Sequence, residues 1–306
     1  MLSIIGKIKR RITRVHYGFD TRREFIFACF DKMLRLSGFK SSLAAEERRK
    51  KFLRSPKDSK SYILRSIRLP FVDKGEERTM RVANIFDEDI LSSYLYFNDD
   101  YSEKTFDLCE KFLGEGLYGL VNEKVNVTVE PGDIVIDAGS CCGTFSAYAS
   151  AKGAVSYAFE PVAENFAYLE RTAKLNKNIN TNNMGLSDEN TRRDIFIDPQ
   201  HFSGSSFLEE LKPNIAPTSV DTVRLDDFVR DNNLPRVDFI KCDIEGFERH
   251  MLAGAQETLA RFAPKLALCT YHLPDDPQVM AELIHKANPK YNIVQKRMKL
   301  FASVSK

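Results

Sequence analysis

The stretch "IVIDAGSCCGTFS", residues 134 to 146, decides the fold that we expect for this chain. An apolar run ends on an acid, Asp137, and then passes through two glycines, Gly139 and Gly143. This pattern is typical of a parallel strand that turns into a helix, where glycines let the backbone approach a ligand and the helix start offers unpaired N–H groups. The stretch therefore predicts a ligand-binding turn at the carboxyl end of a strand.

Strands and helices alternate after this turn. We expect a helix in "TFSAYASAKG", and further strands in "VSYAFEP", "INTNNMGLSD", "VDFIKCDIEG" and "KLALCTYH". Helices are expected in "VAENFAYLERTAKLN", "FERHMLAGAQETLARF" and "DPQVMAELIHKAN", and a terminal β-hairpin in "YNIVQKRMKLFASV". "DIFIDPQHFSGSSF" and "SVDTVRLDDFV" look β-like. This alternation predicts an α/β fold, a parallel sheet with helices on both faces.

The first part of the chain is basic. Residues 1–80 hold 21 Lys and Arg against 9 Asp and Glu, whereas the remainder holds 24 against 34. We divide the chain into a mainly helical extension, 1–115, with helices in "REFIFACFDKMLRLSGF" and "SEKTFDLCEKFLGEG" and a strand in "YILRSIRLPFV", and a second domain, 116–306. The basic segment either contacts an anionic surface or forms a solvated cap that covers the site or mediates a homodimer. We favour the cap, because no RNA-binding motif or DNA-binding helix pair is present.

The cysteines favour a reducing compartment. They show no CxxC spacing, so we expect reduced thiols instead of a zinc site or a disulfide framework. The start of the sequence has too few consecutive apolar residues for a signal-peptide core or a membrane span. We expect a cytoplasmic protein, with peripheral contact at a membrane surface as the alternative that the basic segment leaves open. The six cysteines are Cys29, Cys109, Cys141, Cys142, Cys242 and Cys269.

Two cofactor classes compete for the glycine turn. A dinucleotide needs GxGxxG, but Cys141 and Thr144 stand where the second and third glycines are required. Asp137 would also repel phosphates and attract a cation. S-adenosylmethionine, which carries an ammonium and a sulfonium but no phosphate, fits better. Glu160, 21 residues after Gly139, stands at the end of the next strand, where it can accept both ribose hydroxyls. Dinucleotide-binding folds share that acid, so it supports a nucleoside without choosing one.

Six motifs, taken in order, resemble the FkbM family of S-adenosylmethionine-dependent methyltransferases over about residues 130–275: "VIDAGSCCGTFS", "YAFEPVAENFAYLERTAKLN", "GLSD", "VRLDDF", "VDFIKCDIEGFERHMLAGAQETL" and "CTYHLPDD". The resemblance implies a class I methyltransferase (Rossmann-like) fold, with a seven-stranded sheet whose last strand is antiparallel. It also implies O-methylation of a sugar, a glycosylated metabolite or another natural-product small molecule. The family usually has Asn at the position of Cys141 and Ala at that of Ser140.

Cofactor-binding residues are expected at three places: the glycine turn, the end of the second strand and the end of the third. The third strand end is where class I enzymes recognise adenine. The candidates are Asp137, Gly139, Ser140, Gly143, Glu160, Ser187 and Asp188.

Three residues are candidates for catalysis. Methyl transfer to a hydroxyl needs the reacting atoms held in line and a base that takes the hydroxyl proton. Asp243 ends the fourth strand and Glu245 follows it, where one of the two acids can instead stabilise the next helix start. His272 ends the fifth strand, and its ordinary pKa suits base work. These three residues would alternatively bind a divalent cation, although the sequence signature for a metal is weak and we expect none.

The sequence leaves two rival functions open. One is an RNA-directed methyltransferase that uses the basic N-terminal segment, for which steep salt dependence of binding would be evidence. The other is a non-catalytic protein that keeps the fold and binds the cofactor, for which Cys141 is the only support in the sequence.

Overall fold

The structure is a computed structural model that describes residues 66–73, 76–83, 101–103, 107, 118–198 and 204–305. The predicted helix in "REFIFACFDKMLRLSGF" and most of "SEKTFDLCEKFLGEG" lie outside these residues, as do Cys29 and Cys109. In the described part, no helix is long and apolar enough to cross a membrane, and the cysteines that it contains are free thiols.

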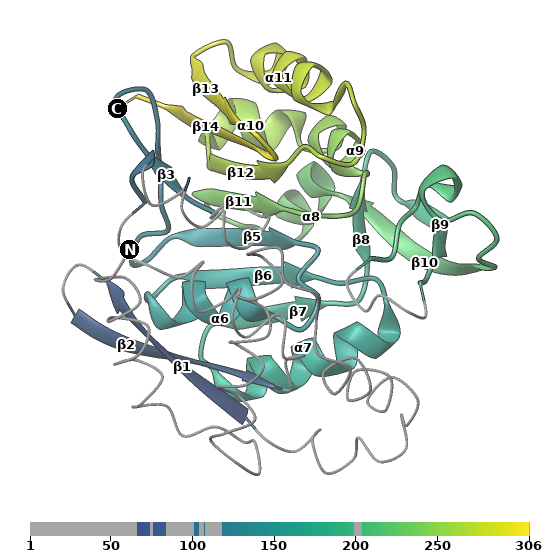
Figure 1. Ribbon diagram of the computed structural model, residues 1–306, viewed down its shortest axis with the longest axis horizontal. Coiled ribbons are helices and arrows are strands. Elements are labelled where there is room, and N and C mark those ends of the chain that lie inside the picture. The colour runs from purple at the N-terminus through teal and green to yellow at the C-terminus, as the bar shows by residue number, and fades with distance from the viewer. Residues whose placement is uncertain are drawn as a thin grey trace, which may run out of the picture.

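A seven-stranded sheet runs through the described part, in the order β13-β14-β12-β11-β5-β6-β7 (Figure 1). The strands from β12 to β7 pair in parallel, and β14 is antiparallel to both of its neighbours. This confirms the predicted parallel sheet and the terminal hairpin. The strands are β5 (Ile134–Ala138), β6 (Val155–Phe159), β7 (Ile179–Asn182), β11 (Phe239–Cys242), β12 (Lys265–Cys269), β13 (Tyr291–Lys296) and β14 (Lys299–Val304).

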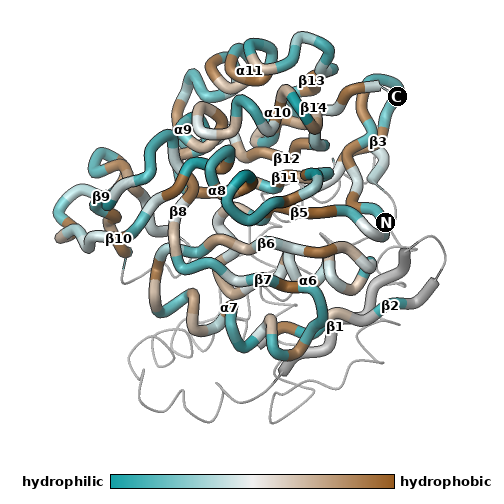
Figure 2. The backbone as a smooth tube through the Cα atoms, turned by 180° about the vertical axis from the view of Figure 1, so that it is seen from behind, coloured by the Kyte–Doolittle hydropathy of each residue, from teal (hydrophilic) through white to brown (hydrophobic). Residues whose placement is uncertain are grey.

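Helices cover the sheet and bury its alternating side chains in two apolar clusters. Val135 and Phe239 lie in the cluster that includes side chains of α6. The residues that follow them, Ile136 and Ile240, lie in the other cluster, which includes side chains of α8 to α11. In Figure 2 the residues of the central strands are mainly hydrophobic, and more polar residues flank them. The helices are α6 (Thr144–Ala151), α7 (Ala163–Leu175), α8 (Leu225–Asp231), α9 (Glu248–Ala253), α10 (Gln256–Phe262) and α11 (Asp276–Ala287).

A hairpin from the N-terminal extension packs against this domain. Strands β1 (Ser66–Asp73) and β2 (Glu76–Ala83) pair antiparallel, which confirms a strand in "YILRSIRLPFV". Met80 and Val82 are buried in the cluster that contains α6, and the Arg78 Nη1 donates to the Ala151 carbonyl at 3.0 Å. Part of the extension therefore shares a hydrophobic core with the sheet domain.

Two predicted elements are each divided in the structure. The helix expected over 247–262 is two helices, α9 and α10, which break at Gly254. A Cβ there would lie 1.9 Å from the Ser187 carbonyl oxygen, so only glycine fits at this position. The first helix ends at this close backbone contact. The third strand is also divided, into β7 and β8 (Gly185–Ser187).

The β-like stretches form a small side sheet. Strand β8 pairs with β10 (Pro217–Arg224), which pairs with β9 (Thr191–Phe196), whereas "LDDFV" is the start of helix α8. Two short strands also pair in the described part, β3 (Leu120–Val121) and β4 (Asn126–Val127), and a 3-10 helix spans Glu209–Leu211.

Candidate functional site

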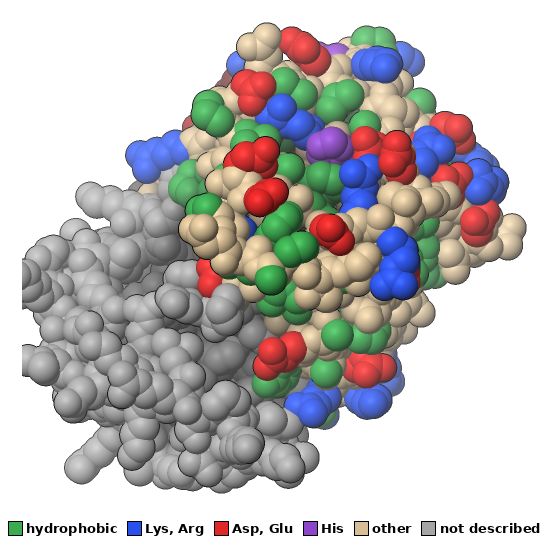
Figure 3. Space-filling model, turned by 90° about the vertical axis from the view of Figure 1, so that its right-hand side faces the viewer, with side chains coloured by type: hydrophobic (Ala, Val, Ile, Leu, Met, Phe, Trp, Pro, Cys, Tyr) green, Lys and Arg blue, Asp and Glu red, His purple; other side chains and the backbone are tan. Residues whose placement is uncertain are grey.

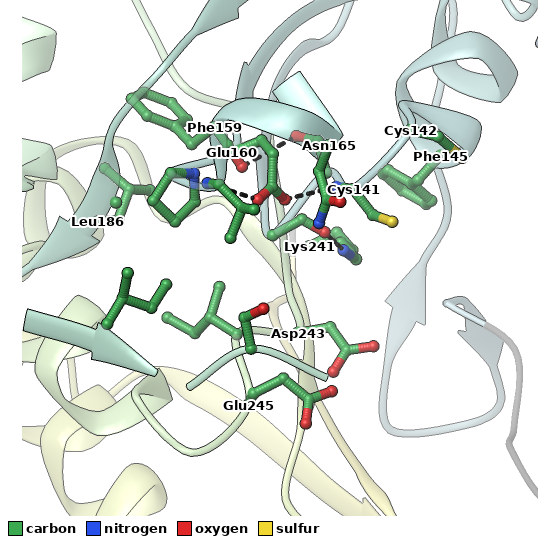
Figure 4. A pocket seen from close by; sticks show the side chains of 18 of the residues that line it. Cys141, Cys142, Phe145, Phe159, Glu160, Asn165, Leu186, Lys241, Asp243 and Glu245 are labelled. Carbon is green, nitrogen blue, oxygen red and sulfur yellow. Dashed lines mark hydrogen bonds between the residues drawn. The ribbon is translucent and has the colours of Figure 1, made fainter. Parts of the chain in front are cut away.

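A pocket opens at the carboxyl ends of β5, β6 and β11, beside the glycine turn (Figure 4). In Figure 4 Glu160, Asn165 and Cys141 lie on one side, and Asp243 and Glu245 on the opposite side. Its walls combine apolar and acidic groups. The lining residues include Tyr118, Ser140, Phe145, Phe159, Val162, Leu186, Ile195, Phe207, Lys241, Ile244 and Tyr271.

The two positions of the turn require glycine for different structural reasons. Gly139 has φ 72°, and a Cβ there would lie 1.9 Å from the Asp243 carbonyl oxygen, so the turn touches the end of β11. Gly143 has φ 85° and begins α6, where a Cβ would lie 2.7 Å from Leu169 of α7. Gly139 brings the turn against the pocket, and Gly143 packs the helix that follows.

Glu160 is the best-defined cofactor candidate. Its carboxylate accepts the backbone N–H groups of Cys141 and Val162, each at 2.9 Å, and it also receives a side-chain hydrogen bond from Asn165. Burial raises the pKa of Glu160 to about 7, against the lowering effect of these N–H groups and of Lys241. A buried acid with a spare lone-pair position at the pocket wall is suited to accept a ligand hydroxyl.

Asp137 lies behind the turn and does not line the pocket. It is fully buried, forms an ion pair with the Lys241 Nζ at 3.2 Å and accepts the Ser146 hydroxyl at 2.7 Å. Lys241 also donates to the Gly139 carbonyl at 2.6 Å. Burial lowers the pKa of Lys241, but the carboxylates of Asp137 and Asp243 outweigh burial, so the pKa lies above its ordinary value. Lys241 therefore neutralises the Asp137 charge and holds the glycine turn through the Gly139 carbonyl.

Ser140 supports the same turn. It is buried, and its hydroxyl donates to the Asp137 carbonyl oxygen at 2.8 Å while its backbone N–H donates to Phe159. It also lines the pocket. The position therefore connects the turn to the end of β6.

Asp243 projects into the pocket from the end of β11. It accepts the Tyr118 hydroxyl at 2.5 Å, and the Tyr271 hydroxyl lies at 3.4 Å from its other oxygen. Burial raises its pKa, but the ammonium groups of Lys241 and Lys299 and the tyrosine hydrogen bond outweigh burial and lower it to about 2. Asp243 is therefore ionised across the neutral range.

His272 lies between two acids. Its Nδ1 is 3.2 Å from the Glu248 Oε1 and its Nε2 is 3.6 Å from the Glu245 Oε2. Burial lowers the pKa of His272, but these carboxylates and Asp243 raise it to about 10. Burial raises the pKa of Glu248. The structure brings Asp243, Glu245 and His272 together, as the sequence predicts, but holds the histidine as a cation.

Ser187 and Asp188 do not line the pocket. Ser187 is buried and donates to Asp188, which pairs with Arg193 at 2.9 Å and with the His250 Nδ1 at 3.0 Å. Burial raises the pKa of Asp188, but His250 and Ser187 lower it overall. The preceding residues of the same strand, Gly185 and Leu186, do line the pocket.

Sequence reasoning missed four polar residues of the site: Tyr118, Asn165, Lys241 and Glu248. Lys241 had a usable signal, because a lysine inside the apolar run "FIKC" must find a buried acid. Glu248 is fully buried, and its Oε1 accepts the Ile244 backbone N–H at 2.9 Å. Nothing in the local pattern around Tyr118 indicated its contact with Asp243, 125 residues later.

The fold and the site together define a class I methyltransferase. The strand order, the antiparallel β14 and the pocket at the glycine turn are the features of that class. Residues 129–291, more than half of the chain, match the methyltransferase FkbM domain. The chain therefore belongs to the FkbM methyltransferase family.

Known relatives match parts of this chain. Methyltransferase 1 of Beauveria bassiana (strain ARSEF 2860) is 28% identical over 145 residues, which are 40% of this chain and 58% of that protein. The crystal structure of a methyltransferase FkbM from Methylobacillus flagellatus KT is similar, with 20% identity, a TM-score of 0.45 and coverage of 71% of this chain and 59% of that one. The chain thus matches less than two thirds of the length of either relative.

A more distant structure is the fibrillarin of Aeropyrum pernix, solved with bound S-adenosyl-L-methionine. It has 13% identity, a TM-score of 0.41, and coverage of 78% of this chain and 82% of that one.

Proposed function

We propose that this methyltransferase uses S-adenosylmethionine to methylate a hydroxyl of a sugar, a glycosylated metabolite or another natural-product small molecule. The observation that carries the cofactor assignment is Glu160, a buried carboxylate at the end of β6 that lines the pocket beside the glycine turn. Cys141, Val162 and Asn165 occupy three of its roughly four lone-pair positions, and a ribose hydroxyl would donate to the position that remains. When bound, the cofactor supplies an electrophilic methyl group on a sulfonium.

The opposite wall of the pocket supports the transfer. The site must hold the acceptor oxygen in line with the methyl carbon and sulfur, and must take up a proton. Asp243 is ionised and faces the pocket, so it is available as the proton acceptor, although a pKa of about 2 makes it a weak base. His272, held as a cation, has no free lone pair for the proton. We therefore favour Asp243 over His272.

Glu245 also lines this wall, and the aromatic rings of Tyr118 and Tyr271 flank Asp243. A pyranose or furanose ring presents hydroxyls to acids and C–H faces to aromatic rings, which is the chemistry that this wall offers. This combination supports a polyhydroxylated acceptor.

Calorimetric titration tests the cofactor assignment first. Wild-type protein is titrated with S-adenosylmethionine and, separately, with NAD, and the titrations are repeated on Glu160→Ala and Asp137→Ala. We expect binding of the methyl donor only, with loss in Glu160→Ala. Methyl-labelled cofactor and a panel of glycosides then test the acceptor. Folded protein that binds NAD, or that binds neither ligand, would contradict the proposal.

The RNA-directed alternative depends mainly on residues outside the described part. On the face in Figure 3, acidic and basic side chains of the described residues are intermixed. A phosphate backbone favours a continuous basic surface, so the described part of this face gives no support to that alternative. RNA binding that weakens steeply with salt would favour it.

A further inference from the structure

Asp243, Glu245 and His272 form a cluster of potential metal ligands at one end of the pocket. One ligand atom from each residue lies within 4.8 Å of the others. A divalent ion with ligand bonds of roughly 2.0–2.2 Å holds its ligand atoms about 3 to 4.4 Å apart. The three atoms therefore need only a small contraction to bind one ion.

The fold delivers these atoms to one place. Strands β11 and β12 are parallel neighbours, so Asp243 and His272, which follow them, emerge at the same edge of the sheet. Glu245 has φ 55°, a left-handed conformation that is uncommon for a residue other than glycine. Gly246 follows with φ 98°, and a Cβ there would approach the His272 Cβ to 3.4 Å. The backbone is thus bent where the acid meets the histidine.

A second, independent observation is the state of the His272 ring. The side chain is only 5% exposed, and neither ring nitrogen makes a hydrogen bond of good geometry. The nearest acceptors are the Glu245 Oε2 at 3.6 Å from Nε2 and the Glu248 Oε1 at 3.2 Å from Nδ1. A buried polar atom without a partner is costly. Coordination of an ion by Nε2 would remove that cost, with the ion taking the place of the proton that otherwise makes the ring a cation.

Neighbouring groups already orient both kinds of ligand. A histidine that binds metal usually gives its other ring N–H to a carboxylate, and fully buried Glu248 stands beside Nδ1 in that position. Asp243 is held by the Tyr118 hydroxyl at its Oδ2. A carboxylate has about four lone-pair positions, so this bond leaves room for an ion.

We propose that Asp243, Glu245 and the Nε2 of His272 bind a divalent cation at the acceptor side of the pocket. Two carboxylates and one imidazole form a mixed oxygen and nitrogen set, which suits a transition-metal ion such as Mn²⁺ better than Ca²⁺, which takes oxygen ligands. The pocket supplies the open side on which further ligands would bind. A role in polarising an acceptor hydroxyl rests on the proposed function, whereas cation binding itself does not.

The test measures binding of Mn²⁺ alone to the full chain, without cofactor or acceptor, by calorimetry and by electron paramagnetic resonance. We expect one Mn²⁺ per chain, with affinity at least about tenfold weaker in Asp243→Asn and in His272→Gln, and about 10- to 100-fold weaker in Glu248→Gln. Zn²⁺ and Mg²⁺ are titrated in parallel to define the preference. Because cofactor is absent, this result is independent of the outcome of the S-adenosylmethionine titration.

His250→Gln is the matched control. His250 also pairs with an acid, Asp188, but neither residue lines the pocket, so the affinity for Mn²⁺ should not change. If the variants do not fold, pulsed resonance spectra of wild type with Mn²⁺ still report whether an imidazole nitrogen is coordinated. Absence of Mn²⁺, Zn²⁺ and Mg²⁺ binding, binding unchanged in the ligand variants, or bound Mn²⁺ without a coordinated nitrogen would each overturn the proposal.

Discussion

The buried carboxylate of Glu160 predicts that cofactor affinity and protein stability respond to pH in opposite directions. Burial raises the pKa of Glu160 from 4.5 to about 7. Ribose hydroxyls that donate to this group favour its ionised form, so a proton competes with the ligand. With a pKa of about 7, the ionised fraction falls from about 90% near pH 8 to about 10% near pH 6, and affinity should fall about tenfold.

Stability should change the other way. The pKa of Glu160 is higher in the folded protein than the ordinary 4.5 of the unfolded chain, so the folded state binds the proton more tightly. The stabilisation is fully present below about pH 4.5 and is lost as the pH rises through about 7. A difference of about 2.5 pKa units corresponds to about 3 kcal/mol of unfolding free energy. Acidification within this window should therefore stabilise the unliganded protein while it weakens cofactor binding.

The assay compares wild type with Glu160→Gln, which is neutral at every pH. S-adenosylhomocysteine binding is measured by calorimetry between about pH 6 and pH 8, and unfolding free energy by denaturant titration. The ligand amino group also titrates in this range, but its contribution is the same for both proteins and cancels in the comparison. Wild-type affinity that stays constant, or that falls equally in Glu160→Gln, would refute the assignment of Glu160 to the ribose.

Three further substitutions, with Gly153→Ala as a control, test the glycine turn. Gly139→Ala places a Cβ 1.9 Å from a backbone carbonyl and should abolish binding of S-adenosylhomocysteine, whereas Gly153→Ala, also at positive φ but 3.7 Å from its nearest neighbour, should retain it in the same titration. Lys241→Met leaves the buried Asp137 without its cation and should lower the unfolding free energy by about 3–5 kcal/mol, measured with denaturant; unchanged stability would contradict the ion pair. Cys141→Asn should raise the unfolding free energy by about 1 kcal/mol, seen as a higher melting temperature, because the residue has φ 50° and asparagine tolerates that conformation. A melting temperature below that of wild type would show that the packing of the thiol matters more.

The parts of the fold that sequence could predict are those set by local pattern. The apolar run, Asp137 and the two glycines specify β5 and the start of α6 within 13 residues, and Glu160 follows at the end of β6. Helix α9 could not be separated from α10 in this way. The break at Gly254 depends on a carbonyl of Ser187, which lies on a different element.

The site shows the same division. Position at a strand end predicted that Asp243, Glu245 and His272 lie together, because parallel strands end at one edge. The protonation of Asp243 and His272 was not predictable, since it depends on Glu248 behind the histidine and on Lys299 near Asp243. Both groups belong to segments that the sheet brings close after the chain has folded.

Asp137 is not the residue through which the pocket would favour a cationic cofactor. From the sequence, this acid was expected to attract a cationic ligand. Its carboxylate is instead fully buried and paired with Lys241, directly opposite it in the register of β5 and β11. Paired charges cancel at ligand distance, so Asp137 neither repels phosphates nor attracts a sulfonium strongly. The acids that do line the pocket are Glu160, Asp243 and Glu245. Their charges favour a cationic cofactor over a dinucleotide. Substitution of these three acids should therefore weaken the discrimination against a dinucleotide more than substitution of Asp137 does.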